Sequence, residues 1–196
     1  TIGTFTQVDT VMRYLLQDQH ADLYGRFIVL KKIISIVYPE DTLFQGALDA
    51  AIEDNLNERA LDDLNNALNL YLQKLPKPDR ASILRLLNDA GYREALFASS
   101  KIELASELAA IDVMQHIGEL QAKVFLLHGR HDTVIPCEQS EQLYEQLKQL
   151  QKNVNLVVTP FVDHGDTDFH LAQLPDVARI IQGFSIYFRN LSRVSV

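Results

Sequence analysis

Apolar side chains recur every three or four residues through most of the first 117 positions, the spacing of one face of an α-helix. A first stripe lies within residues 8–16, and a longer one covers residues 23–38, where Pro39 ends the helix. Asp41 and Asp79 are placed to cap the helices that follow them. Further stripes predict helices over residues 61–75, 80–89 and 95–110. The first part of the chain is therefore predicted to be a set of short packed helices.

The pattern changes at residue 123. Residues 123–128 and 154–160 are short apolar runs, which are typical of buried strands. Between them, residues 136–152 have helical spacing, with Pro136 in the first turn, and residues 180–191 predict a last helix. A helix between two strands implies a parallel crossover, so both strands should end at the same edge of the sheet. The fold class is α/β, mostly helical with two parallel strands.

Composition and charge narrow the function. The chain is 47% hydrophobic and 22% charged, as in ordinary globular proteins, and its net charge of -8 disfavours nucleic acid. Cys137 is the only cysteine, which excludes an internal disulfide and fits a reducing, cytoplasmic location. The longest apolar stretch, residues 27–38, contains two lysines and is shorter than the ~20 residues that span a membrane, so no membrane span is predicted.

One acid and one imidazole follow the two predicted strands. Asp132 lies just after the first strand and His164 just after the second. In parallel sheets, ligands bind beyond the carboxyl ends of strands, and neighbouring strands are only ~4.8 Å apart. These two residues can therefore form a pair in which the carboxylate orients the imidazole as a base.

The segment from Val124 to Pro136 reads V-F-L-L-H-G-R-H-D-T-V-I-P. It resembles the strand and H-G-x-x-D-x-x-x-P segment of the α/β-hydrolase superfamily, and the later D-H-G at residues 163–165 is similar to the segment with its catalytic histidine. The resemblance covers residues 111–190 well. It implies an incomplete α/β-hydrolase fold, with residues 1–117 as a helical cap-like region and residues 118–196 as the C-terminal part of the core.

By this resemblance, Asp132 is the triad acid, His164 is the general base, and no cofactor or metal is needed. The implied activity is cleavage of an ester or related carboxylic bond in a small-molecule substrate. The helical cap would then line the acyl pocket. The superfamily's nucleophile is a serine on a G-x-S-x-G elbow before the acid, and this sequence has no such elbow. We therefore expect the chain to be the C-terminal part of a longer serine hydrolase, inactive by itself.

Each candidate also has a plainer interpretation. Asp132 could cap the helix near Pro136, and His164 could be a solvated loop residue. His128 and His131 are expected to be structural or surface residues. Cys137 lies near a helix start, where a thiolate is favoured, but it follows the acid and is expected to be a partly buried small residue. Five potential metal ligands crowd one loop but do not fit the calcium-loop pattern, so no metal site is predicted: Asp163, His164, Asp166, Asp168 and His170.

Two strands alone leave a sheet edge uncovered, at residues 124–127 or 154–159. An uncovered edge invites pairing with another chain, so we expect a homodimer or a domain-swapped form. The alternative function is a non-catalytic helical interaction domain, in which the helical stripes are the working surface.

Overall fold

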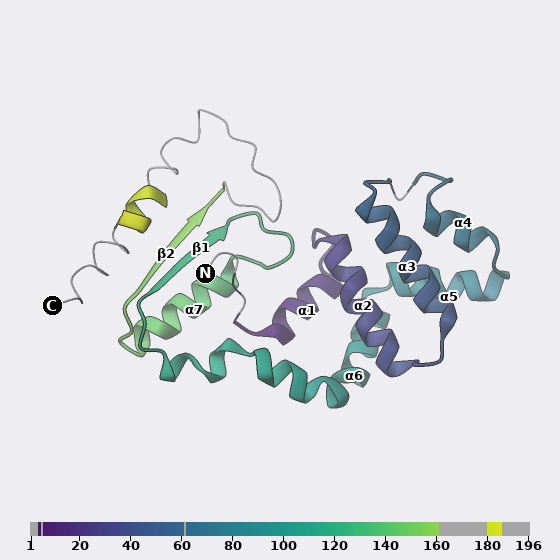
Figure 1. Cartoon of the computed structure of the whole chain (residues 1–196). Coiled ribbons are helices and arrows are strands. Elements are labelled where there is room, and N and C mark those ends of the chain that lie inside the picture. Colours follow the sequence, from purple (N-terminus) through teal and green to yellow (C-terminus); the bar gives the residue numbers. More distant parts are fainter. Residues whose placement is uncertain (1–3, 5, 61, 161–179, 186–196) are drawn as a thin grey trace. The chain divides into compact units, whose positions relative to one another are not determined.

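The structure is a computed structural model that describes residues 4, 6–60, 62–160 and 180–185. It divides into two compact units (Figure 1). The helical unit is Met12–Leu108, and the sheet unit combines Thr1–Val11 with Ala109–Val196. The boundary between the units thus lies before the predicted one at residue 117, because Val113, Ile117 and Leu120 pack in the core of the sheet unit. That the helical part acts as a cap stays a prediction.

Six helices build or enter the helical unit: α1 Val8–Gln17, α2 Leu23–Val37, α3 Thr42–Leu56, α4 Ala67–Gln73, α5 Lys77–Asn88 and α6 Ala90–Ile111. Their apolar stripes form its core, with Leu30, Ile83 and Phe97 fully buried. The predicted helices over residues 8–16, 23–38 and 95–110 are confirmed. Asp41 caps α3 as predicted, since its carboxylate accepts a hydrogen bond of 2.9 Å from Phe44 N.

Two predicted helix starts are wrong. The apolar spacing placed a helix from residue 61, but α4 begins only at Ala67, and Leu64 is 71% exposed. The start is set by Asn66, the N-cap residue, whose side chain accepts a hydrogen bond of 2.7 Å from Asn69 N. Asp54, a fully buried side chain of α3, adds a second cap, since it accepts hydrogen bonds from Ala67 N and Leu68 N at 2.7 and 2.8 Å. Long-range capping of this kind leaves no periodic signal.

Asp79 does not cap α5. This helix begins at Lys77, with Pro76 as the N-cap residue, so Asp79 lies inside its first turn. Pro78 is accommodated there because the N–H groups of the first turn have no partner within the helix. Both prolines therefore belong to the helix start.

Two arginines are buried in the helical unit without a carboxylate hydrogen-bonded to them in the described part of the chain. Arg26 donates to the carbonyls of Leu15, at 2.7 Å, and Asp18. Arg93 donates to Leu16 O at 2.5 Å and Leu87 O at 2.8 Å. Burial lowers the pKa of both guanidinium groups, and the nearby charge of Arg26 lowers the pKa of Arg93 further. The two arginines cap the carbonyl end of α1 from the side.

The sheet unit contains the predicted strand–helix–strand. Strands β1 Val124–Gly129 and β2 Val154–Thr159 are parallel, with Val124 opposite Val154 and Gly129 opposite Thr159. Helix α7 Glu138–Gln149 connects them. Its Leu143 and Leu147 pack with Leu126 of β1, which is 1% exposed. This arrangement is a partial α/β-hydrolase fold, as the sequence predicted.

The other face of β1 meets the helical residues 180–185, the described part of the predicted last helix. The rings of Phe125 and Phe184 lie with their centroids 4.9 Å apart. Gly183 allows this approach, because a Cβ atom there would lie 2.6 Å from the Phe125 ring. Successive residues of β1 thus face opposite helices, as the twofold repeat of a strand requires.

The N-terminal segment joins the sheet unit through α7. Gln139 accepts hydrogen bonds at its Oε1 from Thr6 N at 3.1 Å, Thr6 Oγ1 at 2.8 Å and Gln7 N at 3.1 Å. Thr6 is fully buried and Gln139 is 2% exposed.

Within the described residues, the structure has no helix that is long and apolar enough to cross a membrane.

Candidate active site at the ends of the parallel strands

The loop that follows β1, residues 130–137, is here called the acid loop. It carries Asp132, which is 7% exposed. The Oδ1 atom of Asp132 accepts hydrogen bonds from Val134 N and Ile135 N, each 2.9 Å long. An aspartate that accepts from backbone groups two and three residues ahead closes a tight turn on itself. The position of the carboxylate is therefore set by its own loop.

Asp132 does not cap α7. The N-cap residue of that helix is Cys137, which makes no side-chain capping bond. The plainer interpretation of Asp132 as a helix cap is wrong, because its Oδ1 is engaged within the acid loop, ahead of the helix. The carboxylate instead holds Val134 and Ile135 of the acid loop in place.

His128, the second-last residue of β1, has no solvent exposure. Its Nε2 atom lies 2.8 Å from Ile135 O and 3.4 Å from Asp132 Oδ2, and its Nδ1 atom lies 2.5 Å from Ser140 Oγ. The expectation that His128 is structural agrees with this burial, but its direct contact with the acid was missed. The available signal was a histidine inside an apolar strand, where both ring nitrogens need partners. His131, in contrast, is exposed.

Cys137 is half-buried, as expected. Its environment does not favour a thiolate, however: burial raises the pKa of the thiol, and the charges of Glu138 and Glu141 raise it further, against an opposing effect of Arg130. The expected benefit of the helix start is outweighed by burial of the thiol and by the acidic residues of that first turn.

His164 and the loop of potential metal ligands from Asp163 to His170 lie outside the described residues. The pairing of Asp132 with His164 thus stays a prediction. The strands that precede the two residues do run side by side, and Gly129 and Thr159, at their ends, are partners in the register. Across the part of the chain that is described, His, Cys, Asp and Glu side chains form no group of three or more suited to a metal ion.

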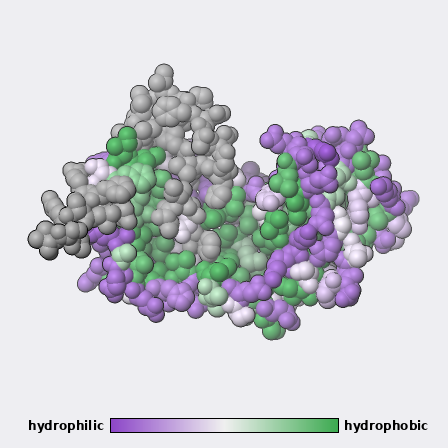
Figure 2. Space-filling model, viewed as in Figure 1, coloured by the Kyte–Doolittle hydropathy of each residue, from purple (hydrophilic) through white to green (hydrophobic). Residues whose placement is uncertain are grey.

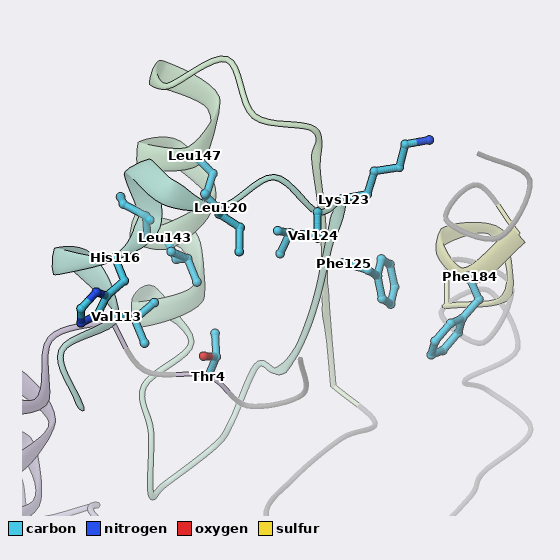
Figure 3. A pocket seen from close by; sticks show the side chains of 12 residues that line it. Thr4, Val113, His116, Leu120, Lys123, Val124, Phe125, Leu143, Leu147 and Phe184 are labelled. Carbon is cyan, nitrogen blue, oxygen red and sulfur yellow. The ribbon is translucent and has the colours of Figure 1, made fainter. Parts of the chain in front are cut away.

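The sheet unit also has an apolar cavity of about 440 Å³, but at the opposite end of β1 from Asp132. Val124 and Phe125, at the start of the strand, line it together with Leu143 and Leu147 of α7, and Phe184 faces Phe125 (Figure 3). Hydrophobic residues gather on the visible face of this unit in Figure 2. Ligands of parallel sheets bind at the carboxyl ends of strands, so this cavity is not the candidate active site.

The parallel strands, the crossover helix and the acid loop place the protein among α/β-hydrolase-fold proteins. The model of the prolyl oligopeptidase family matches residues 83–180, which is half of the 196-residue chain. The chain therefore belongs to the prolyl oligopeptidase family, a family of serine peptidases with this fold. The matched region includes the acid loop and both strands. Among curated proteins and among solved structures, none matches the chain.

Proposed function

We propose that this chain supplies the acid and the base of a serine hydrolase, with Asp132 as the acid and His164 as the base. The nucleophile is a serine on a G-x-S-x-G elbow that this sequence does not contain. The bond cleaved is a carboxylic acyl bond. The sequence resemblance favours an ester, and the name of the matching family adds peptide bonds to the substrates to be tested.

The observation that carries this proposal is the way Asp132 is held. Its carboxylate is nearly buried, at the end of a strand that pairs in parallel with the strand before His164. Two backbone N–H groups hold Oδ1, which fixes the orientation of the carboxylate. An acid in a triad needs this fixed orientation, because its task is to hold one imidazole tautomer and to stabilise the imidazolium that forms.

In the proposed reaction, His164 takes the proton of the serine hydroxyl while the serine oxygen attacks the acyl carbon. Asp132 stabilises the resulting imidazolium and stays ionised. The imidazolium then gives its proton to the leaving alcohol or amine, and an acyl-enzyme forms. Water, activated by the same histidine, releases the carboxylic acid. No cofactor takes part in these steps.

The test uses the complete enzyme that carries these residues together with its elbow serine. We expect Asp132→Asn to lower kcat by about 10⁴-fold, because the amide favours the wrong imidazole tautomer, and His164→Ala to be at least as severe. His131→Ala is the matched control, since this neighbouring histidine is exposed, and it should leave kcat unchanged. Full activity in Asp132→Asn would overturn the assignment.

Substrate class is tested on the same enzyme with two panels, short-chain p-nitrophenyl esters and chromogenic peptide amides with proline before the scissile bond. Turnover of either panel supports acyl-bond hydrolysis, and the panel with the larger kcat/KM identifies the substrate class.

A fluorophosphonate probe, which modifies only activated nucleophiles, should label the complete enzyme but not residues 1–196 alone. A stoichiometric adduct on residues 1–196 would place the nucleophile in this chain and contradict the proposal.

A second function, a non-catalytic interaction domain, draws support from apolar side chains on the surface of the helical unit. Ile102 is 87% exposed and Leu56 is 65% exposed. If the complete enzyme hydrolyses neither panel and binds no fluorophosphonate, this function takes precedence.

A further inference from the structure

We propose that His128 is a positioning residue that holds the acid loop in place, with its tautomer fixed by the carbonyl of Ile135. The structural part of this proposal stands on the geometry of the loop. Its consequence for catalysis rests on the proposed function of Asp132.

The partners of His128 determine where its proton lies. Its Nε2 atom faces two oxygens that can only accept, Ile135 O at 2.8 Å and the ionised carboxylate of Asp132 at 3.4 Å. Nε2 must therefore carry a hydrogen, which it donates to Ile135 O. The longer distance to Asp132 Oδ2 is an electrostatic contact beside this bond.

The other ring nitrogen is held from α7. With the hydrogen of the neutral imidazole on Nε2, Nδ1 accepts, and the Ser140 hydroxyl, 2.5 Å away, donates to it in preference to Thr4 O, which is 3.5 Å from the same hydroxyl. His128 and Ser140 both have no solvent exposure, so water cannot replace either partner. The strand, the acid loop and the first turn of α7 are thereby joined through one imidazole.

Ile135 connects His128 to Asp132 through two backbone hydrogen bonds. Its N–H donates to Asp132 Oδ1, and its carbonyl accepts from His128. The residue that supports the carboxylate is thus itself supported by His128. Without the Nε2–H group, the carbonyl of Ile135 loses its partner, the turn loosens, and one of the two donors to Asp132 is no longer held in place.

The first experiment uses the 196-residue chain and needs no activity. Long-range ¹H–¹⁵N spectra of the imidazoles should show His128 as the tautomer with hydrogen on Nε2. Amide exchange of Val134 and Ile135 should become about tenfold faster in His128→Leu, which has no donor, but stay near the wild-type rate in His128→Gln, whose amide nitrogen can donate from a similar position. Amides in the middle of α6, in the helical unit, provide the internal reference.

An Nδ1–H tautomer would overturn the proposal, as would unchanged exchange of both amides in His128→Leu or equal loss of protection in the Leu and Gln variants. If His128→Leu does not fold, the tautomer of the wild-type chain and the protection of the two amides in His128→Gln still test whether His128 supports the acid loop.

The second experiment uses the complete enzyme. His128→Leu should lower kcat by about 100-fold with little change in KM, because misplacement of the acid affects the chemical step, and His128→Gln should restore most of the loss. An unchanged kcat in His128→Leu would overturn the catalytic part. Failure of the proposed function gives a different result, since Asp132→Asn is then active while the amides of the acid loop still respond to His128→Leu.

Discussion

Ionisable side chains in this protein are repeatedly bound by backbone groups. Asp132 and Asp54 accept from backbone N–H groups, and Arg26 and Arg93 donate to backbone carbonyls. Hydrogen bonds to a charged group are worth more than neutral ones, which offsets part of the cost of burial. Such residues fix the direction of the chain where helices and strands end, and for Asp132 we propose a chemical role in addition to this structural one.

At the same scale, the thiol of Cys137 should react slowly with iodoacetamide at neutral pH. Burial and the charges of Glu138 and Glu141 raise its pKa, so the reactive thiolate appears only at higher pH than in an ordinary cysteine. Alkylation rates followed by mass spectrometry across pH provide the measurement. Glu141→Gln should lower the midpoint of the rate profile, whereas Glu145→Gln, an exposed acid of the same helix, should not. A wild-type midpoint below that of free cysteine would contradict this.

Residue roles were only partly predictable. The place of Asp132 just after a strand could be predicted from a motif, which is local in sequence, while its role as the acid stays a prediction. The contact between His128 and Asp132 depends on how the acid loop folds back over the strand, and the partner of its other nitrogen, Ser140, comes from α7. A sequence pattern predicts where a strand ends but not the path of the loop after it.

At the scale of elements, periodicity predicted the bodies of the helices better than their ends. The boundaries of α2 and α3 follow from Pro39 and the cap Asp41, which act within a few residues. The start of α4 depends on its local cap Asn66 and on the distant Asp54, and the start of α5 depends on the tolerance of a first turn for proline. The contribution of a distant side chain such as Asp54 could not have been predicted from local spacing.

The start of α6 should depend on Asp89 in a pH-sensitive way. Its carboxylate accepts from Tyr92 N at 2.9 Å, and this hydrogen bond, with a smaller contribution from Arg85, lowers its pKa. A lowered pKa in the folded state contributes stability above the unfolded pKa, and that stability is lost as pH falls through the folded pKa.

Asp89→Ala should therefore have a lower melting temperature than wild type at neutral pH, and the difference should shrink in acid. Thermal unfolding followed by circular dichroism tests this. Asp89→Asn is the matched control, because its amide oxygen can still accept from Tyr92 N at every pH. A deficit of Asp89→Ala that is constant from neutral to acid pH would show that the ionised carboxylate is not responsible.

At the scale of the whole molecule, the two units have separate cores. Leu147 is 1% exposed in the core of the sheet unit, and Leu86 is fully buried in the helical unit. Leu147→Ala should destabilise the sheet unit by about 2–5 kcal/mol, the range for a buried leucine, and leave amide exchange in the helical unit unchanged. Leu86→Ala should do the reverse. Equal acceleration in both units by either variant would mean that they unfold as one.

Self-association through an uncovered sheet edge stays a prediction. In the described residues the sheet consists of β1 and β2, and the side chains from Asn155 to Val158 of β2 are only half-buried. Light scattering at high concentration should give twice the chain mass of 22.2 kDa. A single monomer peak that does not shift with concentration would contradict the prediction.

The acid loop also has a consequence for the order of folding. His128 contacts Ser140 twelve residues away and Ile135 seven away, and Asp132 bonds within three residues. Thr6 and Gln139, in contrast, are 133 residues apart. Short loops close at a smaller entropic cost and earlier than long ones. The turn around Asp132 should thus assemble soon after β1 and the first turn of α7, and the N-terminal segment should dock later onto a site already shaped.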